Sequence, residues 1–117
     1  MRIFHTNQVD PTGVELYASS SSSDTLPGNA GIPLRKVVWK TGTASASEWL
    51  DVRFQAAKTI TSLCLVDHTL QVGDTVTLKA NSSVSFASPP FSQSVTVTAG
   101  MIGITFSAQT YQYWRLE

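Results

Sequence analysis

Five residues of this sequence combine useful side-chain chemistry with positions that a ligand could reach. They are a glutamate, an aspartate, a histidine and two aromatic residues: Glu48, Trp49, Asp67, His68 and Phe91. A flat aromatic ring can stack on the C–H face of a sugar ring, while carboxylate and imidazole groups can bind its hydroxyls. The same mixture also suits a contact with another protein. We therefore take the five as candidate ligand-binding residues, with carbohydrate or protein as the ligand.

Sequence patterns that indicate catalysis, a metal or a cofactor are absent. There is no glycine-rich phosphate loop, no cysteine–histidine cluster and no His-Glu-x-x-His sequence. Asp67 and His68 are adjacent, but neighbours in a strand point to opposite faces, so they would make a poor catalytic pair. We expect no enzymatic activity, no metal and no cofactor. For His68 three interpretations stay open: a turn histidine bonded to the backbone, a ligand-binding residue, or a metal ligand.

Charge and composition narrow the range of partners. The chain has 117 residues, and eight Lys and Arg balance eight Asp and Glu, so the formal net charge is zero. Nucleic acid and anionic membranes normally require a basic excess, and neither partner is expected. Only 14% of the residues are charged while 42% are hydrophobic, which argues against intrinsic disorder. We expect one folded domain that buries roughly 65% of its unfolded surface.

Short β-strands must position the candidate residues. In segment 49–54, Leu50, Val52 and Phe54 alternate with polar residues, which predicts a half-buried strand with Trp49 on its outward face. Turn residues separate nine such segments, and this pattern predicts an all-β antiparallel sandwich or barrel with negligible helix. The predicted strands are 15–18, 34–40, 49–54, 59–66, 75–80, 84–86, 94–99, 101–106 and 111–116.

The first part of the chain differs from the rest. Five consecutive serines at 19–23 are followed by two prolines and two glycines up to residue 33. This composition predicts irregular structure, either a long crossover loop or a linker to an N-terminal arm. We expect a single β-sandwich domain over 1–117, with one or more N-terminal strands and a serine-rich loop in 1–33 and the main strands in 34–117.

Cysteine and tryptophan positions allow three further predictions. Cys64 lies in an apolar segment and is expected to be buried and reduced, since a single cysteine forms no disulfide within the chain. Trp39 and Trp114 share the phase of apolar neighbours and are expected in the core, whereas Trp49 is expected to be more exposed.

The N-terminus has no apolar stretch of signal-peptide length, and no segment approaches the roughly 18 apolar residues of a membrane helix. Folding in the cytoplasm is therefore expected.

Three segments, taken together, carry a family resemblance. They are Val37-Val38-Trp39-Lys40 with Glu48-Trp49-Leu50-Asp51-Val52, then residues 60–70, and Tyr111-Gln112-Tyr113-Trp114-Arg115-Leu116. In this order and spacing they resemble galactose-binding-like (discoidin-related) β-sandwich domains, in the variety found in bacteriophage and prophage tail or virion proteins. Two departures stand out: Arg53 begins a stretch where the family usually has Leu-Gly, and Thr69 stands where Asn is common.

The resemblance implies a jelly-roll β-sandwich and a non-catalytic structural or accessory role in a phage or prophage particle, associated with the tail. Such a module would dock to other virion subunits as a homo-oligomer, and it would reside in the virion after assembly in the host cytoplasm. The alternative is a carbohydrate-binding module that recognises a surface glycan, and one tail protein can combine both roles. Relatives usually continue beyond the position of Glu117, so a minimal version or a fragment of a longer chain is expected.

Strand alternation predicts where the candidate residues gather. If consecutive strands run antiparallel, successive loops fall at alternating ends of the sandwich. Four loops then share the end that holds the five candidates and Gln109, namely 41–48, 67–74, 87–93 and 107–110. The competing interpretation is that any sandwich end gathers polar and aromatic residues by chance.

Overall fold

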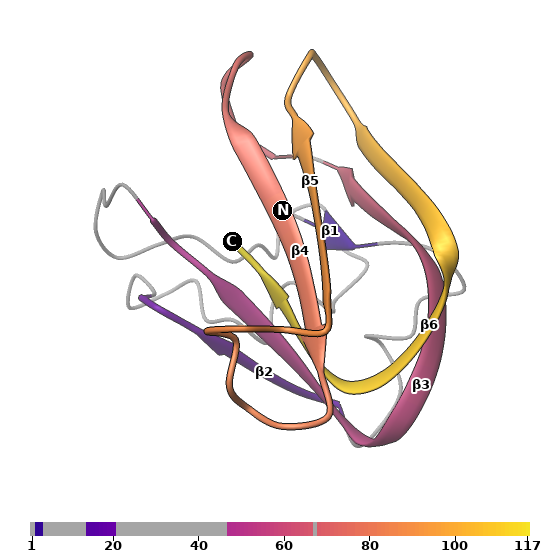
Figure 1. Ribbon diagram of the computed structural model, residues 1–117. Coiled ribbons are helices and arrows are strands. Elements are labelled where there is room, and N and C mark those ends of the chain that lie inside the picture. The colour runs from indigo at the N-terminus through magenta and orange to yellow at the C-terminus, as the bar shows by residue number, and fades with distance from the viewer. Residues whose placement is uncertain (1, 4–13, 21–46, 67) are drawn as a thin grey trace.

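A computed structural model describes residues 2–3, 14–20, 47–66 and 68–117. These residues form six strands and no helix (Figure 1): β1 (Arg2–Ile3), β2 (Glu15–Ala18), β3 (Leu50–Val66), β4 (Thr75–Asn81), β5 (Phe91–Thr96) and β6 (Ile102–Leu116). The all-β prediction is confirmed. The predicted strand 34–40, with Trp39, lies outside the described residues, as does Asp67. No helix in the described part of the chain is long and apolar enough to cross a membrane.

Two long antiparallel strands, β3 and β6, connect the two layers of the sandwich. Their register shifts between Arg53 and Lys58 and again between Ile60 and Ser62, and both strands curve strongly along their length (Figure 1). All six strands are connected by hydrogen bonds into one curved sheet. The first half of β3 and the last part of β6 belong to the part that we call the larger sheet, in which β2 pairs with β3, β4 with β6, and β5 with β4. The second half of β3 pairs with the first part of β6 and with β1.

The predicted strand boundaries were wrong at two bends. Segments 49–54 and 59–66 form the single strand β3, and segments 101–106 and 111–116 form the single strand β6. The intervening residues, 55–58 and 107–110, are mostly polar or small and exposed, so they resemble turns in sequence although the chain does not reverse there. Register shifts bend the strand without ending it. Segment 84–86 is not a strand but part of the connection from β4 to β5.

The hydrophobic core lies between the layers and follows the predicted alternation. Leu50, Val52 and Phe54 of β3 are buried. Trp114 is 4% exposed, so its predicted core position is confirmed. The other buried apolar residues of this cluster are Leu63, Leu65, Val76, Leu78, Ala80, Val97, Ile102, Ile104 and Leu116. Each large apolar side chain buried in this way stabilises the fold by roughly 1.5–3 kcal/mol.

Cys64 is half-buried, so the prediction that it is buried was wrong. Its neighbours Leu63 and Leu65 face the core, so Cys64 points to the opposite face of the strand, where it pairs with Gly103. The apolar composition of this segment concealed an ordinary alternation of inward and outward residues.

Candidate functional site

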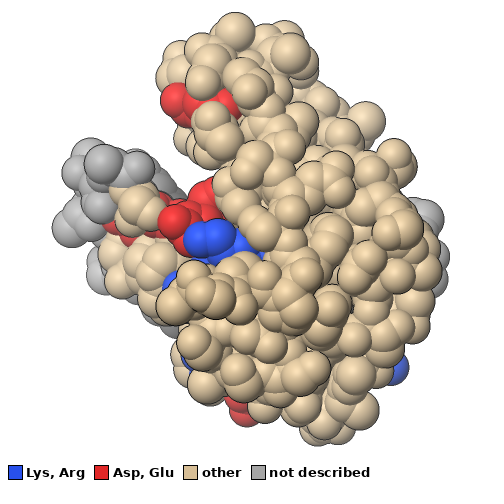
Figure 2. All heavy atoms as spheres, viewed as in Figure 1, with Lys and Arg blue, Asp and Glu red and all other residues tan. Residues whose placement is uncertain are grey.

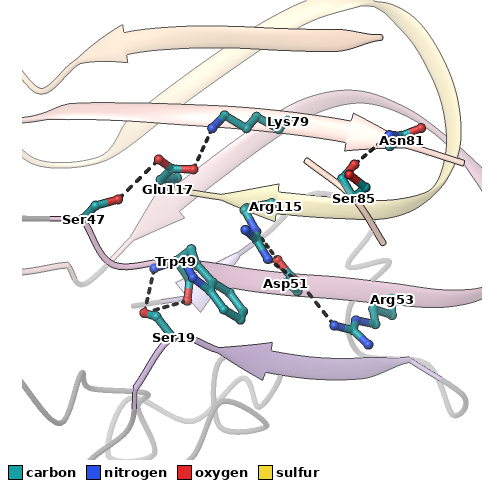
Figure 3. Close-up of polar contacts among 10 residues, drawn as sticks. All are labelled: Ser19, Ser47, Trp49, Asp51, Arg53, Lys79, Asn81, Ser85, Arg115 and Glu117. Carbon is teal, nitrogen blue, oxygen red and sulfur yellow. Dashed lines mark hydrogen bonds and ion pairs between the residues drawn. The ribbon is translucent and has the colours of Figure 1, made fainter. Parts of the chain in front are cut away.

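The outer face of the larger sheet carries a row of polar and aromatic side chains. The strand register places Tyr17 beside Asp51, Asp51 beside Arg115, and Arg115 beside Lys79. These residues come from β2, β3, β6 and β4, and they alternate with the residues that face the core. Figure 3 shows this face with the side chains that bond across it.

Asp51 lies at the centre of the row, and its side chain is only 1% exposed. Arg115 Nε donates to Asp51 Oδ1 at 2.6 Å and Nη2 donates to Oδ2 at 3.0 Å, while Arg53 Nη2 donates to Oδ2 at 3.4 Å (Figure 3). A buried carboxylate is tolerated only when it is paired and hydrogen-bonded, and a two-point contact with a guanidinium group satisfies it well. The pair therefore fixes the position of the Arg115 guanidinium group.

Aromatic rings cover both guanidinium groups. Arg115 Cζ lies 4.0 Å from the ring centroid of Trp49 and 4.5 Å from that of Phe86, and Arg53 Cζ lies 4.0 Å from that of Tyr17. Cations over ring faces attract the ring electrons, most strongly for tryptophan. Phe86 is 7% exposed yet lies outside the main core, which shows that this face has a small buried cluster of its own. Trp49 is thus held in a defined position while remaining half-exposed.

Hydrogen-bonding groups surround Trp49 where β3 begins and β6 ends. The Ser19 N–H donates to the Trp49 carbonyl oxygen at 2.9 Å, and the Trp49 N–H donates to Ser19 Oγ at 2.9 Å. The Glu48 carboxylate accepts hydrogen bonds from the hydroxyls of Ser19 and Ser20. We call this site the β3-start cluster, and it comprises Ser19, Ser47, Glu48, Trp49, Lys79 and Glu117.

Glu117 completes the cluster from the end of the chain. Its carboxylate accepts a hydrogen bond from Lys79 Nζ at 2.7 Å and another from Ser47 Oγ at 3.3 Å (Figure 3). The bond from Lys79 holds the pKa of Glu117 below its usual value, so the carboxylate is ionised at neutral pH. Figure 2 shows acidic and basic residues meeting in one hollow, where Figure 1 places the C-terminal end, on a surface that is otherwise largely uncharged.

The structure brings together two of the five predicted site residues. Glu48 and Trp49 lie side by side in the β3-start cluster, and Trp49 is more exposed than Trp114, as predicted. Phe91 begins β5 and packs its ring on those of Phe106 and Trp114, with centroids 4.9 and 5.9 Å apart, next to the core. Asp67 lies outside the described residues.

His68 and Gln109 have other surroundings. The two ring nitrogens of His68 are buried, and no described residue bonds them, so the backbone bond expected of a turn histidine is not found in the described part of the chain. Gln109 lies within β6, where its side-chain amide donates to Ser107 Oγ at 3.1 Å. In the part of the chain that the structure describes, no three His, Cys, Asp or Glu residues are grouped so that they could hold a metal ion.

Sequence reasoning missed most partners of Trp49. Alternation in segment 49–54 places Asp51 and Arg53 on the outward face together with Trp49. This shared outward face was the feature of the sequence that could have indicated Asp51 and Arg53 as neighbours of Trp49. It did not identify the Asp51–Arg115 pair, because pairing across strands depends on a register that a single sequence does not contain.

Comparisons with known proteins identify the fold. No protein-family model and no curated protein sequence matches the chain. Solved structures do match. One is chitosan-binding module 1 from a chitosanase/glucanase of Paenibacillus sp. IK-5, with a TM-score of 0.70 and 20% identity over 89% of this chain and 80% of the module. Module 2 of the same enzyme, in complex with chitotriose, has a TM-score of 0.71 and 15% identity over 89% of this chain and 82% of that one.

A third similar structure comes from another organism. It is the family 32 carbohydrate-binding module of Clostridium perfringens NanJ in complex with galactose, with a TM-score of 0.70 and 13% identity over 92% of this chain and 83% of that one. Sequence identities this low establish the fold alone. The chain therefore has the galactose-binding-like antiparallel β-sandwich fold, as predicted.

Proposed function

We propose that this chain is a non-catalytic carbohydrate-binding module that binds sugar at the β3-start cluster. The observation that carries the proposal is the likeness, over about nine-tenths of the chain, to modules that were solved as binders of chitosan, chitotriose or galactose. A fold by itself hosts many functions, so the residues of the site must support the same conclusion.

The β3-start cluster has the composition that sugar binding requires. Trp49 is half-exposed, and Arg115 covers one face of its ring and holds it in place, so a sugar would stack on the opposite face. The carboxylates of Glu48 and Glu117 accept hydrogen bonds, and Lys79 donates them. A sugar hydroxyl both donates and accepts, so it can join such a network. Because the serine and lysine partners already orient these carboxylates, little ordering is needed when the sugar binds.

The affinity expected of one such site is modest. One sugar ring on one tryptophan, with a few hydrogen bonds, corresponds to a Kd of about 1 mM, or about 4 kcal/mol. Several linked copies would bind a polymeric glycan far more tightly, because the second contact becomes intramolecular.

Isothermal titration of the purified protein with chitotriose and with galactose tests the proposal. We expect binding of at least one of the two sugars. Binding should be at least tenfold weaker in Trp49→Ala, which removes the aromatic ring, and in Glu48→Gln, since a hydrogen bond to a charged group contributes about 1.5–3 kcal/mol. Glu15→Gln is the matched control: it makes the same chemical change at an exposed glutamate of β2 outside the cluster, and it should bind as the parent does. Failure to bind either sugar, or equal binding by all variants, would contradict the proposal.

A structural role in a phage or prophage particle remains a prediction from the sequence resemblance. The three similar structures concern carbohydrate binding, and they offer no support for docking to virion subunits. Carbohydrate binding is therefore the better-supported of the two functions that the sequence analysis considered.

A further inference from the structure

Strand β5 forms an edge of the larger sheet. It pairs with β4 on one side, and no strand in the described part of the chain pairs with its other side. The Val97 N–H, just past the strand, donates to the Asp74 carbonyl oxygen at 2.8 Å. Hydrogen-bonding direction alternates along an antiparallel strand, so the N–H and C=O groups of Ser92, Ser94 and Thr96 point away from β4.

This edge lacks the usual protection against pairing with another chain. Natural edge strands carry charges, prolines or bulges that discourage such contacts. Strand β5 contains neither a charged residue nor a proline, and it pairs with β4 residue by residue from Phe91 to Thr96 without a register shift. The sequence on either side is also uncharged, since no charged residue occurs between Lys79 and Arg115. The nearest charged residue across the sheet is Lys79, which pairs with Ser92 from β4, on the side away from the edge. Two copies of β5 would therefore meet without electrostatic repulsion.

The core is also incompletely covered at this edge. The inward-facing residues of β4, namely Val76, Leu78 and Ala80, are at most 5% exposed. The residues of β5 on the same face, namely Phe91, Gln93 and Val95, remain half-exposed although their strand partners are buried, and Phe91 and Val95 are apolar. An additional strand beside β5 would cover these two apolar side chains.

We propose that β5 pairs antiparallel with β5 of a second copy of this chain, so that the larger sheet continues across a two-fold axis. An antiparallel strand pair is self-complementary about such an axis, so the same patch on each copy forms the whole interface. With Ser94 opposite its own counterpart, Ser92 of each copy faces Thr96 of the other, and all three outward-pointing residues form backbone hydrogen bonds. The dimer carries two copies of the β3-start cluster and so supplies a second binding site.

Ser94 offers a direct test by sedimentation equilibrium over a concentration series. For the parent protein we expect an average mass that rises from 12.6 kDa toward twice that value. Ser94→Pro removes an N–H that points away from β4, a position where an edge strand tolerates proline, together with the hydroxyl contact to Thr77. Ser94→Lys places two like charges opposite each other. Both variants should remain at 12.6 kDa throughout.

Two control variants separate edge pairing from other effects. Ser94→Ala loses the hydroxyl contact to Thr77 Oγ1 at 2.8 Å but keeps the N–H, and it should dimerise like the parent. Thr75→Lys adds the same charge on the exposed face of β4, one strand away from the edge, and should also dimerise. A parent protein that stays monomeric up to about 1 mM, growth beyond the dimer, or dimers that persist in both Ser94→Pro and Ser94→Lys would overturn the proposal.

Discussion

The two faces of the first half of β3 are held by different kinds of interaction. On the inner face, Leu50 and Val52 belong to the apolar core, whose burial stabilises the fold without demanding a particular direction. On the outer face, Asp51 is equally buried but is held by directional bonds to Arg115 and Arg53. The difference shows how one strand can serve stability on one side and a defined surface for binding on the other.

Arg115→Ala should have the largest effect on the outer face. It leaves the Asp51 carboxylate buried without its two-point partner, and breaking a buried ion pair in this way lowers the free energy of unfolding by about 3–5 kcal/mol. Denaturant unfolding measures the loss. Leu50→Ala on the inner face should cost a similar amount, about 2–5 kcal/mol, through a cavity. If Arg115→Ala costs less than about 1 kcal/mol, the outer face is not organised by this ion pair.

Arg53→Ala separates the two arginines that contact Asp51. Arg53 makes a single contact of 3.4 Å and its side chain is 29% exposed, whereas Arg115 makes two shorter contacts and is 19% exposed. We expect a loss of about 1 kcal/mol or less, as for partly exposed pairs. Denaturant unfolding of Arg53→Ala and Arg115→Ala under the same conditions measures the ratio of the two losses in unfolding free energy. Equal losses would mean that both arginines stabilise the buried Asp51 carboxylate to the same extent.

Cys64→Ser extends the comparison to the second half of β3. Cys64 is half-buried on the face opposite Leu63 and Leu65, so a hydroxyl there need not be desolvated. The change in unfolding free energy should be about 0.5 kcal/mol or less. The matched inner-face change, Leu65→Ala, should cost about 2–5 kcal/mol. A Cys64→Ser loss above about 2 kcal/mol would show that the thiol belongs to the core.

The Lys79–Glu117 pair should give the smallest effect, and a pH-dependent one. Folding lowers the pKa of Glu117, chiefly through the hydrogen bond from Lys79, so the pair stabilises the fold above the ordinary value of about 4.5. This contribution is lost as the pH falls through the lower pKa of the folded state. Lys79→Met should therefore lose a few tenths of a kcal/mol at neutral pH and progressively less in acid. A difference that grows on acidification would contradict this assignment.

Alternation in the sequence was sufficient to predict the inner face of the fold. It identified Leu50, Val52 and Phe54 as core residues and Trp49 as an outward residue, because both follow from the period of two in a strand. It failed where the chain bends without reversing, at 55–58 and 107–110. Those stretches have the composition of turns, and half or more of the residues in each fall in the register shifts between β3 and β6, so the sequence does not mark them as continuous strand.

The candidate site was predictable in part for the same reason. Glu48 and Trp49 are adjacent in sequence, so no knowledge of register was needed to place them together. The pairing of Asp51 with Arg115 and of Lys79 with Glu117 depends on how distant strands align. Phe91 follows two prolines and resembles a loop residue, but the rings of Phe106 and Trp114 beside it make the core-facing position favourable.

Amide chemical-shift mapping during titration with chitotriose and with galactose tests most directly whether sugar binds at the β3-start cluster. We predict shifts for the backbone amides of Ser47, Glu48 and Trp49, for the amide of Glu117 at the end of the chain, and for the indole N–H of Trp49. Shifts confined to the turns at 70–74 and 97–101 or to the β4–β5 connection, or no shifts with either sugar, would contradict the account.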